Sequence, residues 1–276
     1  MAEPLVWLNG ATVPADEARV SAFDRGLLLG DGVFETLRAV DGTPLAARRH
    51  LARLRRSAEA VRIDLPYDDE ALRSAMTAVL AGVAAPQARV RITVTAGPGP
   101  LGPAREASEP TVLVAAAPLP PPAERTAVCT VPWPHNERSP LAGVKTTSRG
   151  EGVVALAHAR ALGCSEALLA DTTGRLCEGT ASNVFLVLDG RLVTPSLATG
   201  CLAGVTRELV LELTDAVEAD VPLSALAEAS EVFLTSTGRG VQAVHRVDDR
   251  ELPAPGPRTA AARAALEAHL AAHPDP

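Results

Sequence analysis

A run of prolines divides this chain into two parts. Residues 118–125 read PLPPPAER, with four prolines in five positions. Proline fixes φ and removes a backbone donor, so this segment can continue neither a helix nor a central strand. The sequence therefore predicts a linker over residues 118–125, a smaller α+β domain over residues 1–117 and a larger domain over residues 126–276.

The bulk composition restricts the class of protein. An apolar content of 47% with 21% charged residues in 276 residues is typical of a globular chain with two modest domains. The net charge of −7 argues against a nucleic-acid partner. No apolar run is long enough to span a membrane, and no secretion signal is recognisable. The four cysteines match neither a CxxC pair nor a zinc ligand set. We therefore expect buried thiols in a reducing cytoplasm and no metal site.

Turn residues and apolar periodicity predict the secondary structure. In the first part we expect hairpin turns at Asn9-Gly10 and Asp41-Gly42, because this dipeptide type favours two-residue hairpins. Apolar spacing predicts helices over 48–62 and 68–82, and alternation predicts paired strands over 88–97 and 110–118. For the second part the same signals predict helices over 149–162, from 204 onward and over 258–273, strands over 166–171 and 231–236, and a hairpin over 183–195.

Lys145 is the only lysine in the chain, beside 25 arginines. A guanidinium stays protonated at any working pH, whereas an ammonium can lose its proton on burial and act as a nucleophile or base. Lys145 ends a short extended segment, and the hydroxyls of residues 146–148 are predicted to cap the next helix. The sequence therefore marks Lys145 as a candidate catalytic residue.

Three further segments accompany this lysine. Glu178 lies among small and apolar residues in LCEGTASNVFLV. Val205 and Thr206 open a helix whose free backbone N–H groups favour a phosphate. Ser236 and Thr237 belong to TSTGRG, a composition that suits a nest of amides around an anion. An amine, an acid and two anion-binding segments together describe what pyridoxal 5'-phosphate needs from a protein.

The chain as a whole resembles the fold-type IV pyridoxal-phosphate enzymes, which include branched-chain and D-amino-acid aminotransferases and 4-amino-4-deoxychorismate lyase. The motifs that carry the resemblance follow the family's order, from RGLLLGDGVFETLR and HLARL through VKTTSRGEGVVALA and LCEGTASNVFLV to GCLAGVTR and EVFLTSTGRGVQAV. The resemblance implies an α+β, two-domain fold with the cofactor in the cleft between the domains. It also implies a homodimer whose partner loops close each site.

The same resemblance implies roles for individual residues. Lys145 is similar to the lysine that forms the Schiff base with the cofactor and then moves protons at the substrate carbon. Glu178 is similar to the glutamate that keeps the pyridine nitrogen protonated, and Arg53 of HLARL is similar to a phosphate-binding arginine. The other phosphate ligands implied by the resemblance are Val205, Thr206, Ser236 and Thr237.

Two residues favour a lyase within this family. Arg149, four residues after Lys145, and Thr36, in GDGVFETLR, resemble residues of aminodeoxychorismate lyase, in which the arginine would pair with a substrate carboxylate and the threonine would shuttle a proton. The predicted reaction converts 4-amino-4-deoxychorismate to 4-aminobenzoate and pyruvate, a step toward folate. Ala96 stands where a carboxylate-binding arginine is often found. The candidates for carboxylate binding are therefore Arg149, Arg239 and Arg38.

Two alternatives stay open at this point. An aminotransferase acting on branched-chain or D-amino acids would return the cofactor as an amine and require a keto acid as second substrate. A protein that binds pyridoxal phosphate without turnover would retain the fold, but the complete set of Lys145, Glu178 and phosphate ligands argues against this alternative.

Overall fold

The computed structural model describes residues 4–276, which form two compact units. The first contains the chain up to Pro120 together with Val144–Arg149 and His273–Pro276; the second contains Pro121–Gly143 and Gly150–Ala272. The change of unit at Pro120 falls inside the proline-rich segment. Val144–Arg149 lies with the first unit, because Thr146 forms a bridge with Val33. The sequence boundaries had placed this segment with the second part.

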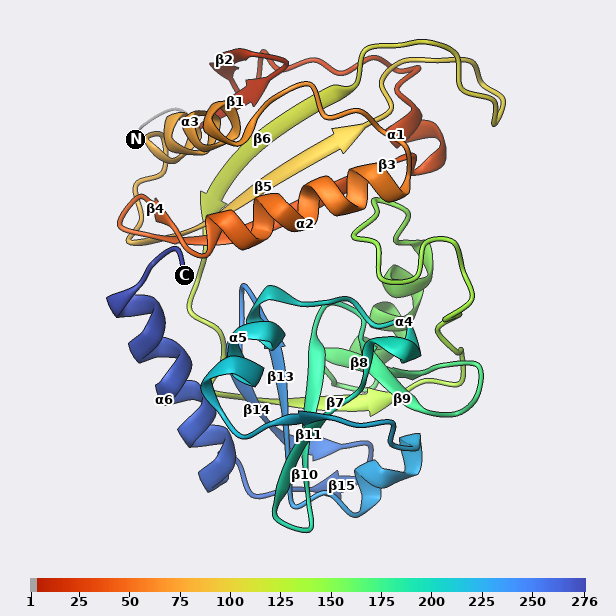
Figure 1. Ribbon diagram of the computed structural model, residues 1–276, viewed down its shortest axis with the longest axis vertical. Coiled ribbons are helices and arrows are strands. Elements are labelled where there is room, and N and C mark those ends of the chain that lie inside the picture. The colour runs from red at the N-terminus through yellow and green to blue at the C-terminus, as the bar shows by residue number, and fades with distance from the viewer. Residues whose placement is uncertain (1–3) are drawn as a thin grey trace. The chain divides into compact units, whose positions relative to one another are not determined.

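A six-stranded antiparallel sheet forms the centre of the first unit (Figure 1). Its order is β2-β1-β6-β5-β3-β4. The strands are β1 Leu5–Leu8, β2 Ala11–Pro14, β3 Gly32–Val40, β4 Thr43–Pro44, β5 Gln87–Thr95 and β6 Thr111–Pro118. The two predicted hairpin turns are present, and Asn9-Gly10 and Asp41-Gly42 all have positive φ, as this turn type requires.

Two helices cover one face of this sheet. Helix α2 spans Ala47–Ala60 and α3 spans Asp69–Leu80, close to the predicted ranges. Their apolar sides pack with the inward residues of β3, β5 and β6 into one core. Because strand side chains alternate between faces, Phe34 and Thr36 of β3 point to the face opposite Val33 and Leu37. That opposite face carries most of the candidate residues of the first unit.

The second unit is built on a mixed nine-stranded sheet of order β12-β11-β10-β13-β14-β7-β8-β9, with β15 beside β14. Its strands are β7 Arg125–Thr130, β8 Glu166–Ala170, β9 Leu176–Gly179, β10 Asn183–Leu188, β11 Arg191–Thr194, β12 Val217–Glu218, β13 Glu231–Ser236, β14 Gly240–Val247 and β15 Arg250–Glu251. The predicted strands at 166–171 and 231–236 and the hairpin at Asp189-Gly190 are present, whereas β7, β9, β12, β14 and β15 carry no clear alternation.

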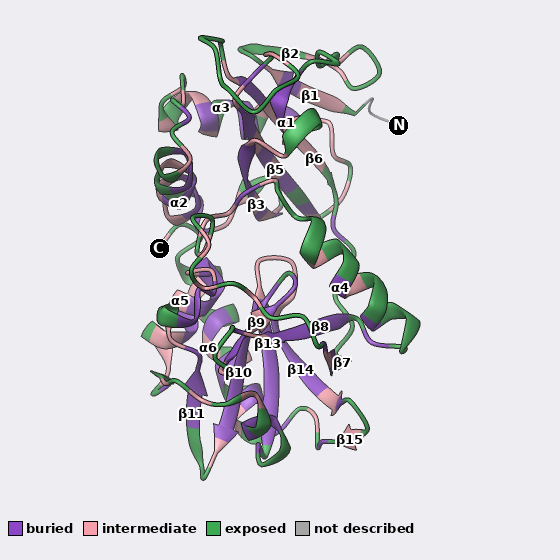
Figure 2. Cartoon of the chain, turned by 90° about the vertical axis from the view of Figure 1, so that its right-hand side faces the viewer, coloured by how far each residue is buried: buried purple, intermediate pink, exposed green. Residues whose placement is uncertain are grey.

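Three helices belong to this unit: α4 Gly150–Ala161, α5 Val205–Leu213 and α6 Pro257–Ala272. Helices α5 and α6 pack together, and both contact β13. Helix α4 is largely exposed in Figure 2, and only Ala155 and Ala159 are buried. All four cysteines are free thiols buried in this unit.

The first unit also contains contacts that no local pattern predicts. Helix α1, Arg25–Leu29, ends at Gly30, and its Arg25 is buried with its guanidinium on Asp31 and on the carbonyls of residues 102–104. At the start of α2, the amide of Ala46, its N-cap residue, donates to the Pro274 carbonyl, and the amide of Arg48 donates to Asp275 Oδ1. Within residues 4–276 no helix is long and apolar enough to cross a membrane, and no group of His, Cys, Asp and Glu side chains could hold a metal ion.

Candidate active site

Lys145 is anchored by its backbone beside β3. The amide of Phe34 donates to the Lys145 carbonyl at 2.9 Å, and the amide of Lys145 donates to Ser57 Oγ at 3.3 Å. Its side chain crosses the ring of Phe34, with Nζ 4.8 Å from the ring centroid. An ammonium over an aromatic face is attracted by the ring quadrupole. The only lysine is therefore held on the sheet face opposite the core.

The hydroxyls of Thr146 and Thr147 bind backbone carbonyls that precede and open β3. Thr146 Oγ1 donates to the Gly32 carbonyl at 3.0 Å and Thr147 Oγ1 donates to the Gly30 carbonyl at 2.8 Å. These two hydroxyls therefore hold the segment against the start of β3. The close approach also restricts Gly30, which has φ of +66° and whose added Cβ would lie 3.0 Å from Ser148 Cα.

Arg91 is a candidate that the sequence analysis missed. Its Cζ lies 3.8 Å from the Phe34 ring centroid, and Nε donates to Thr93 Oγ1 at 3.1 Å. In the β3–β5 register Arg91 pairs with Thr36. Burial lowers the pKa of Arg91, and the nearby charge of Arg149 lowers it further. Arg91 and Lys145 thus share the Phe34 ring, and Arg149 lies close enough for its field to act on Arg91.

Arg38 lies on the same face, two residues beyond Thr36 along β3. Its Nε is buried and has no hydrogen-bond partner among the described residues. Arg38 and Arg89 oppose each other in the β3–β5 register. The predicted residues Thr36, Arg38, Lys145 and Arg149 therefore border one cationic sheet face, to which Arg91 belongs.

Arg53 lies on the other face of the sheet, in a buried group with Glu35 and His50. Its Nε donates to Glu35 Oε1 at 2.7 Å and its Nη2 donates to Glu35 Oε2 at 2.9 Å. His50 Nδ1 lies 2.7 Å from the same Oε2. All three side chains are almost completely buried. The HLARL motif is thereby explained, because both its polar residues bind one carboxylate.

The charges in this group follow from burial and pairing. Burial raises the pKa of Glu35, but the charge and hydrogen bonds of Arg53, with help from His50, outweigh burial and lower it to about 2. Burial lowers the pKa of His50 despite the pull of Glu35. Glu35 is therefore ionised at neutral pH, and a neutral His50 donates its Nδ1 proton to it.

Glu178, in the second unit, is held by two donors. It lies in β9, and its Oε2 accepts from the Leu202 amide at 2.9 Å and from Asn183 Nδ2 at 3.3 Å. Asn183 Nδ2 also donates to the Leu202 carbonyl at 2.8 Å. The side chain is half-buried. This carboxylate is thus fixed against the loop that leads into α5.

The predicted phosphate ligands lie at the ends of two neighbouring elements. Helix α5 begins at Val205, and its N-cap is Gly204, which offers no side chain to cap the first turn. Ser236 and Thr237 lie where β13 turns into β14, and α5 packs against β13. The Thr235 hydroxyl is buried without a hydrogen-bond partner among residues 4–276. An uncapped helix N-terminus and turn hydroxyls offer donors for a phosphate, and a carboxylate held in place offers an acceptor for a protonated ring nitrogen. Pyridoxal phosphate fits these groups.

Arg239 has protein partners on several sides. Its Nη1 donates to Ser165 Oγ at 3.2 Å and to Gln242 Oε1. Its Nη2 lies 3.5 Å from Glu166 Oε2, and that buried carboxylate also accepts from Ser182 Oγ at 3.1 Å. Arg239 therefore links the β13–β14 turn to the start of β8 through these hydrogen bonds.

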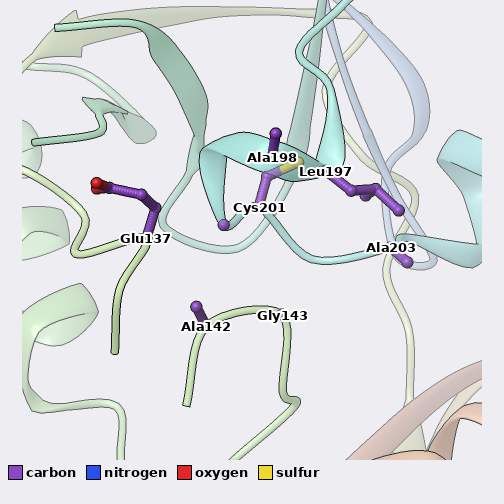
Figure 3. A pocket seen from close by; sticks show the side chains of 8 residues that line it. Glu137, Ala142, Gly143, Leu197, Ala198, Cys201 and Ala203 are labelled. Carbon is purple, nitrogen blue, oxygen red and sulfur yellow. The ribbon is translucent and has the colours of Figure 1, made fainter. Parts of the chain in front are cut away.

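A cavity of about 410 Å³ borders the loop before α5. Figure 3 shows it between the turn at Leu197 and Ala198 and the loop at Ala142 and Gly143. The carboxylate of Glu137 points away from this space and binds the amide and hydroxyl of Thr172. The cavity thus has small, mainly apolar walls and reaches Cys201, the neighbour of Leu202.

These sites and the two-sheet fold define a pyridoxal-phosphate enzyme of fold type IV. The chain belongs to the class IV aminotransferase family, whose model "Amino-transferase class IV" matches residues 32–247. A putative branched-chain-amino-acid aminotransferase of Methanocaldococcus jannaschii is 34% identical over 256 residues, which cover 89% of this chain and 88% of that protein.

Solved structures agree with this assignment. The branched-chain aminotransferase of Thermoproteus uzoniensis with norvaline gives a TM-score of 0.91 at 27% identity, covering 98% of this chain and 96% of that chain. The T.th. branched-chain amino acid aminotransferase complexed with N-(5'-phosphopyridoxyl)-L-glutamate gives 0.89 at 27% identity, covering 99% and 96%.

The predicted fold and the predicted cofactor, pyridoxal 5'-phosphate, are confirmed by this family membership. The predicted family is confirmed too, but the resemblance to the lyase within it is not, because these relatives are named branched-chain aminotransferases. The roles of the individual residues stay predictions.

Proposed function

We propose that this chain is a pyridoxal-phosphate-dependent aminotransferase that moves an amino group between a branched-chain amino acid and a 2-oxo acid. The observation that carries the proposal is the placement of Lys145 and Arg91 on one aromatic ring, with Arg149 nearby, in a chain of this family. An amine and a guanidinium side by side can serve one substrate, because one group acts on the α-carbon while the other pairs with the carboxylate.

We assign the chemistry at the α-carbon to Lys145. Pyridoxal phosphate, when bound, withdraws the electron pair that remains when the α-proton leaves. Lys145 Nζ would take the proton from the α-carbon and return it at the aldehyde carbon of the bound cofactor. Glu178, held by Leu202 and Asn183, supplies the negative charge that keeps the pyridine nitrogen protonated.

Carboxylate recognition is assigned to the cationic face of β3 and β5. Arg91 has a fixed orientation, because Thr93 accepts from its Nε and Phe34 lies beneath its guanidinium. Its Nη atoms then present a planar fork, the geometry that carboxylates accept bidentately. Arg38, with its buried Nε, supplies a second donor on this face. In this proposal Arg91 binds the substrate carboxylate. An arginine often does so from the position that Ala96 occupies in this chain.

Phosphate binding is assigned to two groups. Val205 and Thr206 donate from the first turn of α5, whose dipole favours an anion, and Ser236 and Thr237 donate from the turn after β13. Arg53 stays the predicted phosphate-binding arginine, and Glu35 and His50 hold its guanidinium in one orientation. Arg239 is left out of substrate binding, since Ser165, Glu166 and Gln242 surround it.

Aminodeoxychorismate lyase is the second candidate, and one observation favours it. Arg149 lies close to Arg91, while Thr36 pairs with Arg91 across the strands. Two guanidiniums and a hydroxyl on the face that holds Lys145 suit a substrate with two carboxylates and a proton to relocate. In this reaction Lys145 takes the ring proton, and Thr36 passes a proton to the departing enolpyruvyl group.

We also propose a homodimer in the cytoplasm. Phe23 and the leucines at positions 27, 28 and 29 of α1 are exposed, and α1 is coloured as exposed in Figure 2. Four large apolar side chains exposed within seven residues support an interaction surface at this position. Four buried free thiols are consistent with a reducing compartment. Light scattering of the purified protein measures the oligomeric state, and a monomer at micromolar concentration contradicts the proposed homodimer.

The reaction is tested with two assays on the same holoenzyme. An aminotransferase loses the visible absorbance of its cofactor when leucine, valine or a D-amino acid is added alone, and recovers it when a 2-oxo acid follows. A lyase releases 4-aminobenzoate and pyruvate from aminodeoxychorismate without a second substrate. Release of 4-aminobenzoate with no spectral cycle would overturn the aminotransferase proposal in favour of the lyase. Absence of both signals would refute both.

A further inference from the structure

We propose that Asn183 is a positioning residue that couples the carboxylate of Glu178 to the N-terminal turn of α5, so that one side chain aligns the groups at both ends of the cofactor. This inference rests on the proposed function, because it assumes that Glu178 faces the pyridine nitrogen and that α5 receives the phosphate. Asn183 lies in the segment LCEGTASNVFLV, whose resemblance to the family implies a role for Glu178 but none for Asn183.

The amide group of Asn183 closes a small ring of hydrogen bonds. Its Nδ2 donates to the Leu202 carbonyl at 2.8 Å and to Glu178 Oε2 at 3.3 Å. The Leu202 amide donates to the same Oε2 at 2.9 Å. Two donors on one carboxylate oxygen fix the orientation of the carboxylate and stabilise its charge. Asn183 is the side chain that ties this carboxylate to the loop.

The other end of Asn183 packs against the N-cap of α5. A Cβ added to Gly204 would lie 2.0 Å from Asn183 Oδ1, a distance that real Cβ atoms do not reach. Gly204 has φ of −73°, which any residue adopts, so the backbone conformation does not require a glycine there. Glycine is required because Asn183 occupies the space beside it. Asn183 therefore sets how closely β10 approaches the first turn of α5.

The strand register adds the second phosphate-binding element to this group. Asn183 pairs with Thr235 across β10 and β13, and Ser236 and Thr237 follow directly. Asn183 is itself 5% exposed, so its amide has no room to change partners freely. β9, the N-terminus of α5 and the end of β13 consequently meet at one buried amide. A displaced Asn183 would disturb the pyridine and phosphate contacts together, because both depend on it.

The test measures binding of 4'-deoxypyridoxine 5'-phosphate, which keeps the ring nitrogen and the phosphate but lacks the aldehyde that reacts with Lys145. For Asn183→Ala we expect the dissociation constant to rise about 10- to 100-fold, the usual cost of removing a residue that orients a binding group. Asn183→Asp is isosteric and should bind more weakly still at pH 8, since it places a second carboxylate beside Glu178. The control is Glu267→Ala, at an exposed position on α6 outside this hydrogen-bonded group.

A double-mutant cycle separates positioning from general damage to the fold. Gly204→Ala alone should weaken analogue binding, because the new methyl group displaces Asn183. In the Asn183→Ala background Gly204→Ala should cost much less, since the clashing Oδ1 is gone. The thermal midpoint of each apoprotein is measured in parallel. A merely structural role would lower the midpoints and leave the two binding effects additive.

The outcomes distinguish this inference from the proposed function. If the wild-type protein binds the analogue and Asn183→Ala and Asn183→Asp bind it as tightly, the positioning role is overturned and the proposed function stands. Additive effects in the cycle overturn it as well. If the wild-type protein does not bind the analogue, the proposed function fails and the inference fails with it. Weakened binding with strong coupling between Asn183 and Gly204 supports both.

Discussion

Glu35 allows a quantitative test of the buried group that holds Arg53. Its carboxylate is fully buried and accepts from Arg53 Nε, Arg53 Nη2 and His50 Nδ1. Glu35→Gln keeps the shape and removes the charge. The variant leaves the guanidinium of Arg53, which is 5% exposed, without its counterion. Breaking one side of a buried ion pair is costly because the other charge stays desolvated.

The shift in the pKa of Glu35 gives the size of the expected loss in unfolding free energy. Arg53 and His50 lower this pKa from 4.5 to about 2, which corresponds to about 3 kcal/mol of unfolding free energy. Because the folded-state pKa is the lower one, this stabilisation is complete above pH 4.5 and disappears as the pH falls through 2. His50 acts at higher pH: its folded pKa lies below 6.5, so its contribution is present above pH 6.5 and is lost as the pH falls below that value.

The assay uses a tryptophan that reports on the first unit. Trp7 lies in the same core as α2, and the chain's other tryptophan is Trp133. In a Trp133→Phe background, urea unfolding followed by Trp7 fluorescence measures the free energy of that unit. The control is Glu59→Gln, an exposed glutamate on the same helix as Arg53.

At pH 7 Glu35→Gln should unfold about 3 kcal/mol more easily than its parent, and Glu59→Gln should not differ from it. Between pH 4.5 and 2 the parent should converge on the variant, because its own carboxylate becomes protonated. A loss of less than about 1 kcal/mol at pH 7 would refute the reasoning. A gap that stays constant down to pH 2 would also refute it, since the effect would then not arise from the charge.

Three further predictions concern the reaction. Lys145→Ala should remove the visible absorbance of the reconstituted enzyme and nearly all turnover; substantial remaining turnover would exclude Lys145 from the mechanism. Arg91→Ala should raise KM for the carboxylate substrate about 10- to 100-fold through loss of a charged hydrogen bond, whereas Arg89→Ala, exposed on the same strand, should change it little; equal effects would mean that Arg91 binds no substrate. Arg149→Tyr should reduce 4-aminobenzoate release, if that activity exists, far more than cofactor affinity; equal losses would make Arg149 structural.

Local signals in the sequence predicted most of the elements. The turns at Asn9-Gly10, Asp41-Gly42 and Asp189-Gly190 depend on dipeptides that tolerate positive φ, and the structure has all three. Helices α2, α3 and α4 begin and end within a few residues of their predicted ranges. β7 and β14 were not predicted, because they are buried on both faces and show no alternation of apolar and polar residues.

The residues of the candidate site also fall into two groups, those recognisable in the sequence and those that only the structure identifies. Lys145 was recognisable as the single lysine, and the motifs around Glu178, α5 and TSTGRG were recognisable by their residues. From the sequence, a substrate-binding arginine was expected at position 96, in a loop. Arg91, which lies inside a strand, was not identified. Only the pairing of β3 with β5 places Arg91 opposite Thr36 and above Phe34. Alternation in ARVRITVTAG could have identified the face that Arg91 shares with Arg89.

By itself the sequence determined the hairpin turns, five of the six α-helices and the residue types of the cofactor site, because each depends on neighbours within a few positions, and the order of its motifs determined the family. Tertiary structure decided that residues 144–149 join the first unit, that Glu35 holds Arg53 and that Asn183 reaches Glu178 and Gly204. These relations depend on strand register and on the burial of charge. Both are set by contacts between residues far apart in the chain, which no local pattern records.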